Sequence, residues 1–217
     1  MGGGLLRILP WGVALVCLVA FGLSFAELQR VRGKLGEATR HVFHDHRDVR
    51  QFIINAALAE TSQPIVILGD SITEMAPLPQ ELLGHPLINA GVGGLTIIEA
   101  TSMAQRLFAG RQPFMIICTI GANDVGSQSL EQDYATLLRT LVRITPRMIA
   151  ISGITDDAAN AKMRASAASG NVTFKDVPLP PDGKMSDGIH LTTAGYRVWV
   201  AALTSEIATA MALEAPR

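Results

Sequence analysis

The sequence is poor in cysteine and aromatic residues and carries almost no net charge. Two of its 217 residues are cysteines, 5% are aromatic, and the formal net charge is −1. Cys17 lies in a leading apolar segment and Cys118 in a stretch typical of a buried strand, so we expect neither a disulfide nor a redox role. The chain has no long basic run, and nucleic-acid binding needs clustered Lys and Arg. No nucleic-acid partner is therefore expected.

The first 26 residues predict a signal anchor or a signal peptide. Residues 8–26 contain no charge, and about 19 apolar residues are enough to cross a bilayer as a helix. Small residues at Ser24 and Ala26 would allow cleavage before Glu27, but the apolar run is longer than a usual cleavable core, which favours an uncleaved anchor. Basic residues follow the span, so the flanking charges leave the orientation open. We expect a membrane-anchored or secreted protein whose remaining part is extracytoplasmic, in the periplasm.

Residues 27–60 are predicted to be an amphipathic helix or stalk. Apolar residues recur on a heptad lattice that Asp45 interrupts, which predicts one long helix over residues 27–59. A metal site is suggested by several side chains near its middle, which are His41, His44, Asp45, His46 and Asp48. No other acid or histidine lies nearby in sequence to complete four ligands. We therefore interpret them as a solvated polar face and expect no metal.

Residues 65–69 form an apolar run that ends at Asp70 and Ser71. The run is typical of a buried parallel strand, because both of its faces would be covered. Ser71 would then lie at the carboxyl edge of a sheet, where open α/β sheets bind ligands, with backbone N–H groups of the next helix around it. Ser71 is therefore either a nucleophile or simply the N-cap of that helix.

Two further loops are expected at the same edge. Residues 89–94 form a glycine-rich loop after a short strand and before a helix over residues 96–108, and such a loop can bind an oxyanion or a phosphate. The strongest strand, residues 113–120, is followed by Asn123, whose amide could donate to a reacting carbonyl oxygen or serve as an ordinary turn residue.

The rest of the chain continues the alternation of strands and helices. Helices are expected over residues 74–83, 130–144, 155–168 and 192–212, and strands over 147–152 and 171–177. This alternation predicts a parallel sheet with helices on both faces. Asp187 and His190, three residues apart before the last helix, could place a carboxylate on imidazole Nδ1 and leave Nε2 free as a base.

Taken in order, four short motifs resemble the sequence blocks of the SGNH, or GDSL-type, hydrolases. They are Gly69-Asp70-Ser71-Ile72, the loop over residues 89–94, Gly121-Ala122-Asn123-Asp124 and Asp187-Gly188-Ile189-His190. The resemblance spans residue 64 to the C-terminal helix and implies a flavodoxin-like, three-layer α/β/α domain over residues 61–217, with a five-stranded parallel sheet. It also implies ester hydrolysis without a metal or another cofactor.

Carried over position by position, the resemblance implies a role for each motif residue. Ser71 is the nucleophile, Asp187 and His190 complete a triad, and Gly94 and Asn123 form an oxyanion hole with the Ser71 N–H. Gly93 would replace Gly94 if the loop register differed by one residue. Leu95 stands where the family often has aspartate, and Asp70 and Asp124 are expected to hold the loops through backbone hydrogen bonds.

The expected function is that of a serine esterase for short acyl groups, such as O-acetyl groups on an extracytoplasmic carbohydrate. The partners would then be a small-molecule or carbohydrate ester and, through the N-terminal helix, a membrane. A lysophospholipase or thioesterase, an O-acyltransferase accessory protein and an anchored binding module are the alternatives. The triad residues alone do not separate hydrolysis from acyl transfer.

Overall fold

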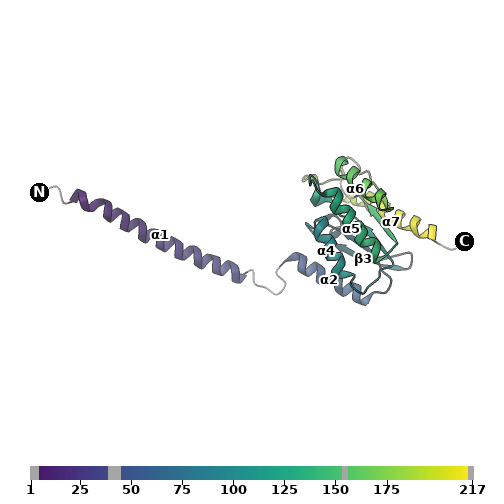
Figure 1. The fold of residues 1–217 in the computed structure, drawn as a ribbon, viewed down its shortest axis with the longest axis horizontal. Coiled ribbons are helices and arrows are strands. Elements are labelled where there is room, and N and C mark those ends of the chain that lie inside the picture. The colour runs from purple at the N-terminus through teal and green to yellow at the C-terminus, as the bar shows by residue number, and fades with distance from the viewer. Residues whose placement is uncertain (1–4, 39–44, 153–155, 215–217) are drawn as a thin grey trace. The chain divides into compact units, whose positions relative to one another are not determined.

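The chain divides into two units, Met1–Asp45 and His46–Arg217. The computed structural model describes residues 5–38, 45–152 and 156–214, and the helices and strands of these ranges are drawn in Figure 1. The second unit contains the sheet and the four short motifs that begin at Gly69 and end at His190.

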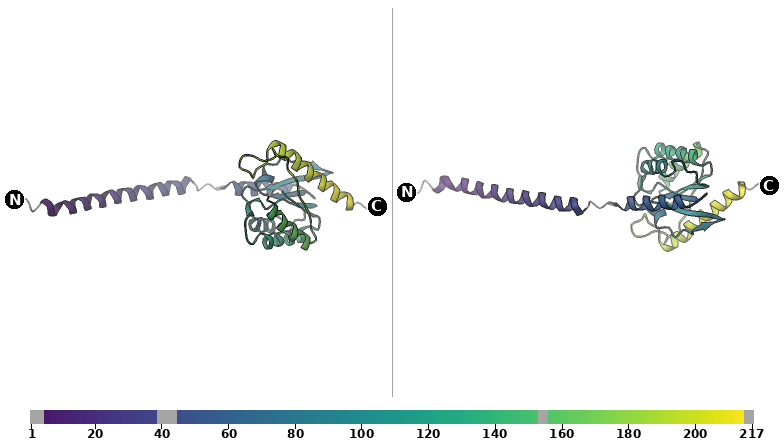
Figure 2. Two further views of the ribbon diagram at one scale, coloured as in Figure 1. Left: turned by 90° about the horizontal axis from the view of Figure 1, so that it is seen from above. Right: turned by 90° about the horizontal axis from the view of Figure 1, so that it is seen from below.

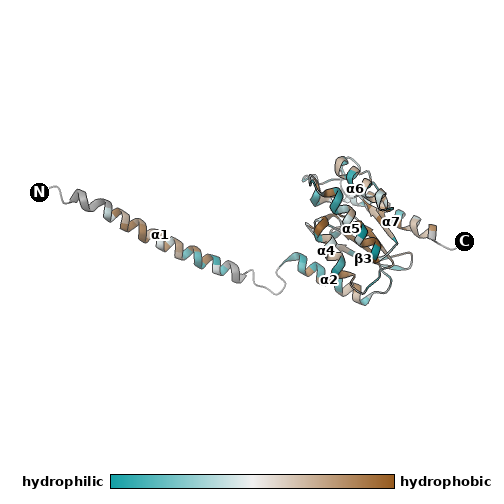
Figure 3. Cartoon of the chain, viewed as in Figure 1, coloured by the Kyte–Doolittle hydropathy of each residue, from teal (hydrophilic) through white to brown (hydrophobic). Residues whose placement is uncertain are grey.

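The first unit contains helix α1, Leu5–Ala38. Its segment Trp11–Lys34 is long and apolar enough to cross a membrane, and no other helix among the described residues meets this criterion. Apolar residues cover much of α1, and polar residues gather toward its C-terminal part (Figure 3). The expected N-terminal apolar helix is therefore present, and its length and composition suit either an anchor or a signal sequence.

The single helix expected over residues 27–59 is wrong. Helix α1 ends at Ala38, Asp45 lies in a bend, and α2, His46–Glu60, begins after it; residues 39–44, including His41 and His44, lie outside the described residues. Asp45 is the position that breaks the apolar lattice. Helix α2 buries Ile54 and Leu58 in the core of the second unit, so it is the first helix of that unit.

Five parallel strands form the sheet, as the sequence predicts. They are β1 (Ile65–Gly69), β3 (His85–Gly91), β4 (Met115–Cys118), β5 (Met148–Ile151) and β6 (Thr173–Lys175). A sixth strand, β2 (Glu81–Leu82), pairs antiparallel with β3, and the strand order is β2-β3-β1-β4-β5-β6.

The expected count of five strands and the helix expected over residues 74–83 both need correction. Helix α3 is only Ser71–Glu74, and the chain then runs irregularly to β2. Pro77 and Pro79 explain the difference, because proline removes a helical N–H donor and disfavours helix at the residue before it. The residues that follow this irregular segment form the short edge strand β2.

Helices cover both faces of the sheet (Figure 2). One face packs against α2, α4 (Ile97–Leu107), α5 (Leu130–Ile144) and α6 (Asp157–Ser169). The other packs against α3 and α7 (Thr193–Glu214). Along β1, Val66 and Leu68 face the first group while Ile65 and Ile67 face the second, which explains why the whole strand is apolar. The expected three-layer α/β/α architecture is confirmed.

The strand order reverses at the carboxyl end of β1, which is the topological switch point of the sheet. The chain passes from β1 to β3 on one side and later returns to β4 on the other side. Connections that leave neighbouring strands in opposite directions open a space between their loops, and open α/β sheets bind ligands there. The loops after β1, β3 and β4 carry Ser71, Gly94 and Asn123, respectively.

Candidate functional site

Asp70 shapes the turn that presents Ser71. Its side chain is fully buried, with Oδ1 accepting from the Ile72 N–H at 3.0 Å and Oδ2 accepting from the Ala122 N–H at 3.3 Å. Burial raises the pKa of the Asp70 carboxyl, and the backbone hydrogen bonds act in the opposite direction. Asp70 is the N-cap of α3, so Ser71 is the first helical residue rather than the cap.

Two glycines allow α3 to lie close to the strands. A Cβ on Gly69 would lie 2.0 Å from Thr73 Oγ1, which itself lies 2.5 Å from Thr119 Oγ1. A Cβ on Gly91 would lie 2.2 Å from the backbone nitrogen of Glu74. Only glycine fits at either contact, so Gly69 and Gly91 allow the close packing of α3 that sets the position of Ser71 relative to the sheet.

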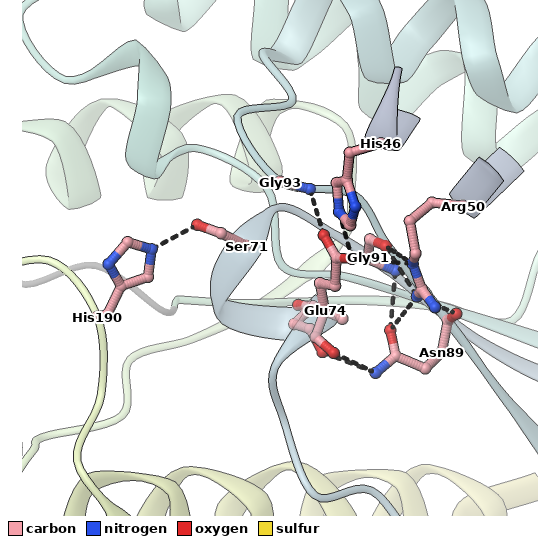
Figure 4. Close-up of polar contacts among 9 residues, drawn as sticks. His46, Arg50, Ser71, Glu74, Asn89, Gly91, Gly93 and His190 are labelled. Carbon is pink, nitrogen blue, oxygen red and sulfur yellow. Dashed lines mark hydrogen bonds and ion pairs between the residues drawn. The ribbon is translucent and has the colours of Figure 1, made fainter. Parts of the chain in front are cut away.

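His190 joins Ser71 and Asp187 through its two ring nitrogens. Nε2 lies 2.9 Å from Ser71 Oγ, drawn in Figure 4, and Nδ1 lies 2.6 Å from Asp187 Oδ2. Asp187 Oδ1 also accepts from the N–H groups of Ile189 and His190, at 2.9 and 3.0 Å. These hydrogen bonds, led by that from the His190 ring, lower the pKa of the Asp187 carboxyl to about 2. The three residues assigned to a triad are thus brought together.

The loops carrying Gly94 and Asn123 are joined to each other. Asn123 Nδ2 donates to the Leu95 carbonyl at 3.0 Å, and Asp124 Oδ2 accepts from the Ile97 N–H at 3.0 Å. Burial raises the pKa of the Asp124 carboxyl. Asp70 and Asp124 therefore tie loops together through backbone hydrogen bonds, as the sequence analysis expects.

The two candidate glycines differ in what their N–H groups do. The Gly93 N–H donates to Glu74 Oε2 at 2.6 Å. Gly94 has a φ of +69° and is exposed, and among the described residues its N–H has no hydrogen-bond acceptor. Gly94 therefore retains a free donor at the edge of the sheet, whereas Gly93 does not.

Sequence reasoning missed a group of polar residues beside this loop. Glu74 Oε1 lies 2.6 Å from His46 Nε2 and 3.2 Å from Arg50 Nε, and Figure 4 shows these side chains around Gly91 and Gly93. The sequence predicts a solvated polar face at His46 and gives no signal at Arg50. The i, i+4 spacing of His46 and Arg50 predicts that they share one face of α2. It does not predict their partners Glu74 and Gly91, because these lie in other segments of the chain.

No metal site emerges from the described ranges. Among residues 5–38, 45–152 and 156–214, no three His, Cys, Asp or Glu side chains are grouped so as to hold an ion. Within the predicted histidine-rich stretch, His46 pairs with Glu74, while His41 and His44 lie outside the described residues.

Three solved structures share this fold at low sequence identity. A lipase/acylhydrolase from Enterococcus faecalis is 20% identical, with a TM-score of 0.54, over 67% of this chain and 95% of that one. Axe2, an acetylxylan esterase from Geobacillus stearothermophilus, is 17% identical, with a TM-score of 0.54, over 68% and 94%. An aryl esterase from M. smegmatis is 15% identical, with a TM-score of 0.53, over 68% and 99%.

The match to a family is more specific. Comparison with curated protein sequences gives no match. Residues 67–198 match the model of the GDSL-like Lipase/Acylhydrolase family, and this range includes all four motifs from Ser71 to His190. The expected resemblance is thereby confirmed, and the chain belongs to the GDSL-like lipase/acylhydrolase family of ester-hydrolysing enzymes.

Proposed function

We propose that this enzyme is a serine esterase that cleaves a carboxylic ester through an acyl-enzyme on Ser71. The observation that carries the proposal is the pair of hydrogen bonds of His190, 2.9 Å to Ser71 Oγ and 2.6 Å to Asp187 Oδ2. A serine hydroxyl is a weak nucleophile until a base accepts its proton, and the base must be held in the correct tautomer. Asp187 accepts from Nδ1 and leaves Nε2 to act on Ser71.

In the first half of the reaction, His190 Nε2 takes the Ser71 proton as Oγ attacks the ester carbonyl carbon. The carbon–oxygen bond to the alcohol then breaks, and the alcohol leaves with the proton from His190. Water repeats the sequence on the acyl-enzyme and releases the acid. Asp187 stabilises the imidazolium that forms in each half, because it remains an anion with its lowered pKa of about 2.

We assign the oxyanion hole to the N–H groups of Ser71 and Gly94 and to the Asn123 amide. The first N–H of a helix has no partner within it, which suits Ser71. The Gly93 N–H is already bound to Glu74, and this supports Gly94 over Gly93. An amide nitrogen carries two N–H groups, so Asn123 can bind Leu95 with one and substrate with the other.

The proposed substrate is a short acyl ester, such as an O-acetyl group on an extracytoplasmic carbohydrate. Gly94, Asn123 and Asp187 are exposed, so the site lies open at the surface and can admit the ester of a bulky alcohol. An acetylxylan esterase is among the proteins of similar fold. The apolar helix α1 would hold the domain at the membrane, in the periplasm.

One observation favours a second candidate, a lysophospholipase or thioesterase with a longer acyl group. A cavity of about 680 Å³ lies between the end of α3 and the start of α7. Met75, Pro77, Tyr196 and Val200 are among its lining residues. Met75 lies one turn after Ser71, and α7 begins three residues after His190, so an apolar chain attached at Ser71 could extend toward this cavity.

Hydrolysis of p-nitrophenyl esters from acetate to palmitate tests the proposal, with Ser71→Ala as the control. We expect turnover of acetate that decreases with chain length and falls at least about a thousandfold in the control. A preference for long chains would favour the second candidate. Equal turnover by both proteins would refute the serine mechanism, and product that forms only with a saccharide acceptor would indicate acyl transfer.

A further inference from the structure

Helix α2 contacts the end of β3, where the glycine-rich loop begins, through main-chain carbonyl groups. Arg50 Nε and Nη2 donate to the Gly91 carbonyl at 3.1 and 2.9 Å, and Nη2 also donates to the Asn89 carbonyl at 3.1 Å. The Arg50 side chain is only 18% exposed, so these bonds are largely shielded from water. A planar guanidinium can hold several acceptors in one geometry, which a lysine ammonium cannot reproduce.

Arg47 holds the far end of the same loop. Its Nη2 donates to the Gly94 carbonyl and its Nη1 to Glu99 Oε1, both at 2.7 Å. Glu99 in turn accepts from the Thr96 N–H at 3.0 Å in the capping box that begins α4. Arg47 therefore ties the Gly94–Leu95 peptide group to the first turn of α4.

Glu74 holds the middle of the loop and is itself held by α2. Its Oε2 accepts from the Gly93 N–H at 2.6 Å, and its Oε1 lies 2.6 Å from His46 Nε2 and 3.2 Å from Arg50 Nε (Figure 4). The Glu74 side chain is 14% exposed. A buried carboxylate with several donors is fixed in orientation, so it fixes the Val92–Gly93 peptide group.

These contacts surround one peptide group. The peptide groups at 92–93 and 94–95 are fixed by Glu74 and Arg47, and the group between them carries the Gly94 N–H, which has no acceptor among the described residues. We propose that His46, Arg47, Arg50 and Glu74 form a clamp that aims the Gly94 N–H at the developing oxyanion. This inference rests on the proposed serine mechanism and makes the four side chains positioning residues.

The clamp would give α2 a role at the site, although the family match begins after this helix, at residue 67. Oxyanion donors act on the transition state more than on bound substrate, so a misdirected Gly94 N–H lowers kcat more than it raises KM. Small displacements of such groups have large effects on rate.

The test is the Arg50→Lys variant of the full chain, with Arg111→Lys as a matched control. Arg111 Nη1 donates to Asn55 Oδ1 and to the Leu107 carbonyl, both at 3.0 Å, so it anchors the other half of α2 without touching the loop. On p-nitrophenyl acetate we expect kcat to fall about tenfold or more in Arg50→Lys, with KM within about twofold. In Arg111→Lys, kcat and KM should both stay within about twofold of the wild-type values.

A second readout separates positioning from a general structural role. An alkylboronic acid forms a tetrahedral adduct with an active serine, so its inhibition constant should rise in Arg50→Lys by about the factor lost in kcat. Glu74→Gln, which keeps the shape but loses the charge, should show the same pattern. If Arg50→Lys does not fold, Arg47→Lys, which alters the contacts of Arg47 with the Gly94 carbonyl and with Glu99, serves in its place.

The outcomes distinguish the clamp from the mechanism on which it rests. If Ser71→Ala abolishes turnover but folded Arg50→Lys keeps its kcat and boronate affinity, the clamp is refuted and the serine mechanism stands. An equal loss in Arg111→Lys also refutes the clamp, because it would trace the effect to the packing of α2. Full activity in Ser71→Ala refutes the mechanism and the clamp together.

Discussion

At the scale of single residues, Asp187 shows how hydrogen bonds set the charge of an exposed side chain. Its carboxylate is 45% exposed, yet three donors, the His190 ring and the N–H groups of Ile189 and His190, lower its pKa to about 2. The hydrogen bonds of the turn over residues 187–190, rather than burial, lower the pKa of this carboxyl.

Replacing Asp187 with Asn tests this conclusion through both activity and stability. The uncharged amide stabilises neither the imidazolium nor its tautomer, so kcat should fall on the order of 10³-fold. Because the folded pKa is lower than the ordinary value of 3.8, the stability that Asp187 contributes is present above pH 3.8 and is lost as pH falls toward about 2. The difference in urea midpoint between wild type and variant should therefore shrink between pH 5 and pH 2; a constant difference would contradict the account.

The same scale explains which site residues the sequence could predict. Ser71, Asn123 and the Asp187–His190 pair are chemically distinctive types that follow strands or precede a helix, and the structure joins His190 to both Ser71 and Asp187. Arg47 and Arg50 bind carbonyl groups of residues about forty positions away. Main-chain carbonyl groups are the same in every residue, so no pattern in the sequence predicts which of them an arginine binds.

At the scale of elements, burial decided what could be predicted. Strands β1 and β4 are buried on both faces and consist of apolar residues throughout, so their sequence identifies them. The short edge strand β2 has no such signal, because one of its two residues is exposed. Apolar spacing predicts one helix in place of α1 and α2, because spacing alone does not distinguish a helix that packs on a sheet from a continuing stalk.

Helix α7 offers the sharpest test at this scale, because it covers most of one face of the sheet. Trp199, in the second turn of α7, is fully buried among the strand residues of that face and donates from Nε1 to the Ser152 carbonyl at 3.2 Å. Trp199→Ala should lower the free energy of unfolding by about 3–5 kcal/mol. Trp199→Phe removes the hydrogen bond but keeps most of the apolar volume, so about 1–2 kcal/mol should be lost.

Urea unfolding monitored by circular dichroism measures both changes, and Val198→Ala is the matched control. Val198 is 39% exposed on the same helix, so its truncation should change the free energy of unfolding by less than about 0.5 kcal/mol. If all three variants lost similar amounts, α7 would contribute through helix formation and not through the core contact of Trp199.

At the scale of the whole molecule, the apolar helix α1 has the length and composition of either a membrane anchor or a signal sequence. Ser24 and Ala26 would allow cleavage before Glu27, but both lie within α1, which continues to Ala38. Cleavage there would divide the helix and release the second unit, residues 46–217, from the apolar segment. We propose the other outcome, an uncleaved anchor, because the uncharged run over residues 8–26 is longer than a usual cleavable core.

We therefore expect the full-length chain to stay in the membrane fraction after a carbonate wash, with an intact mass that includes the first 26 residues. Leu18→Arg places a charge near the middle of the apolar run, where insertion costs about 2.5–3.5 kcal/mol more, and should move much of the protein out of that fraction. Leu28→Arg is the matched control, since an arginine near the end of a span can reach the interface, and it should stay bound. A soluble wild-type protein that begins at Glu27 would instead identify a signal peptide, and the catalytic unit would then act without an anchor.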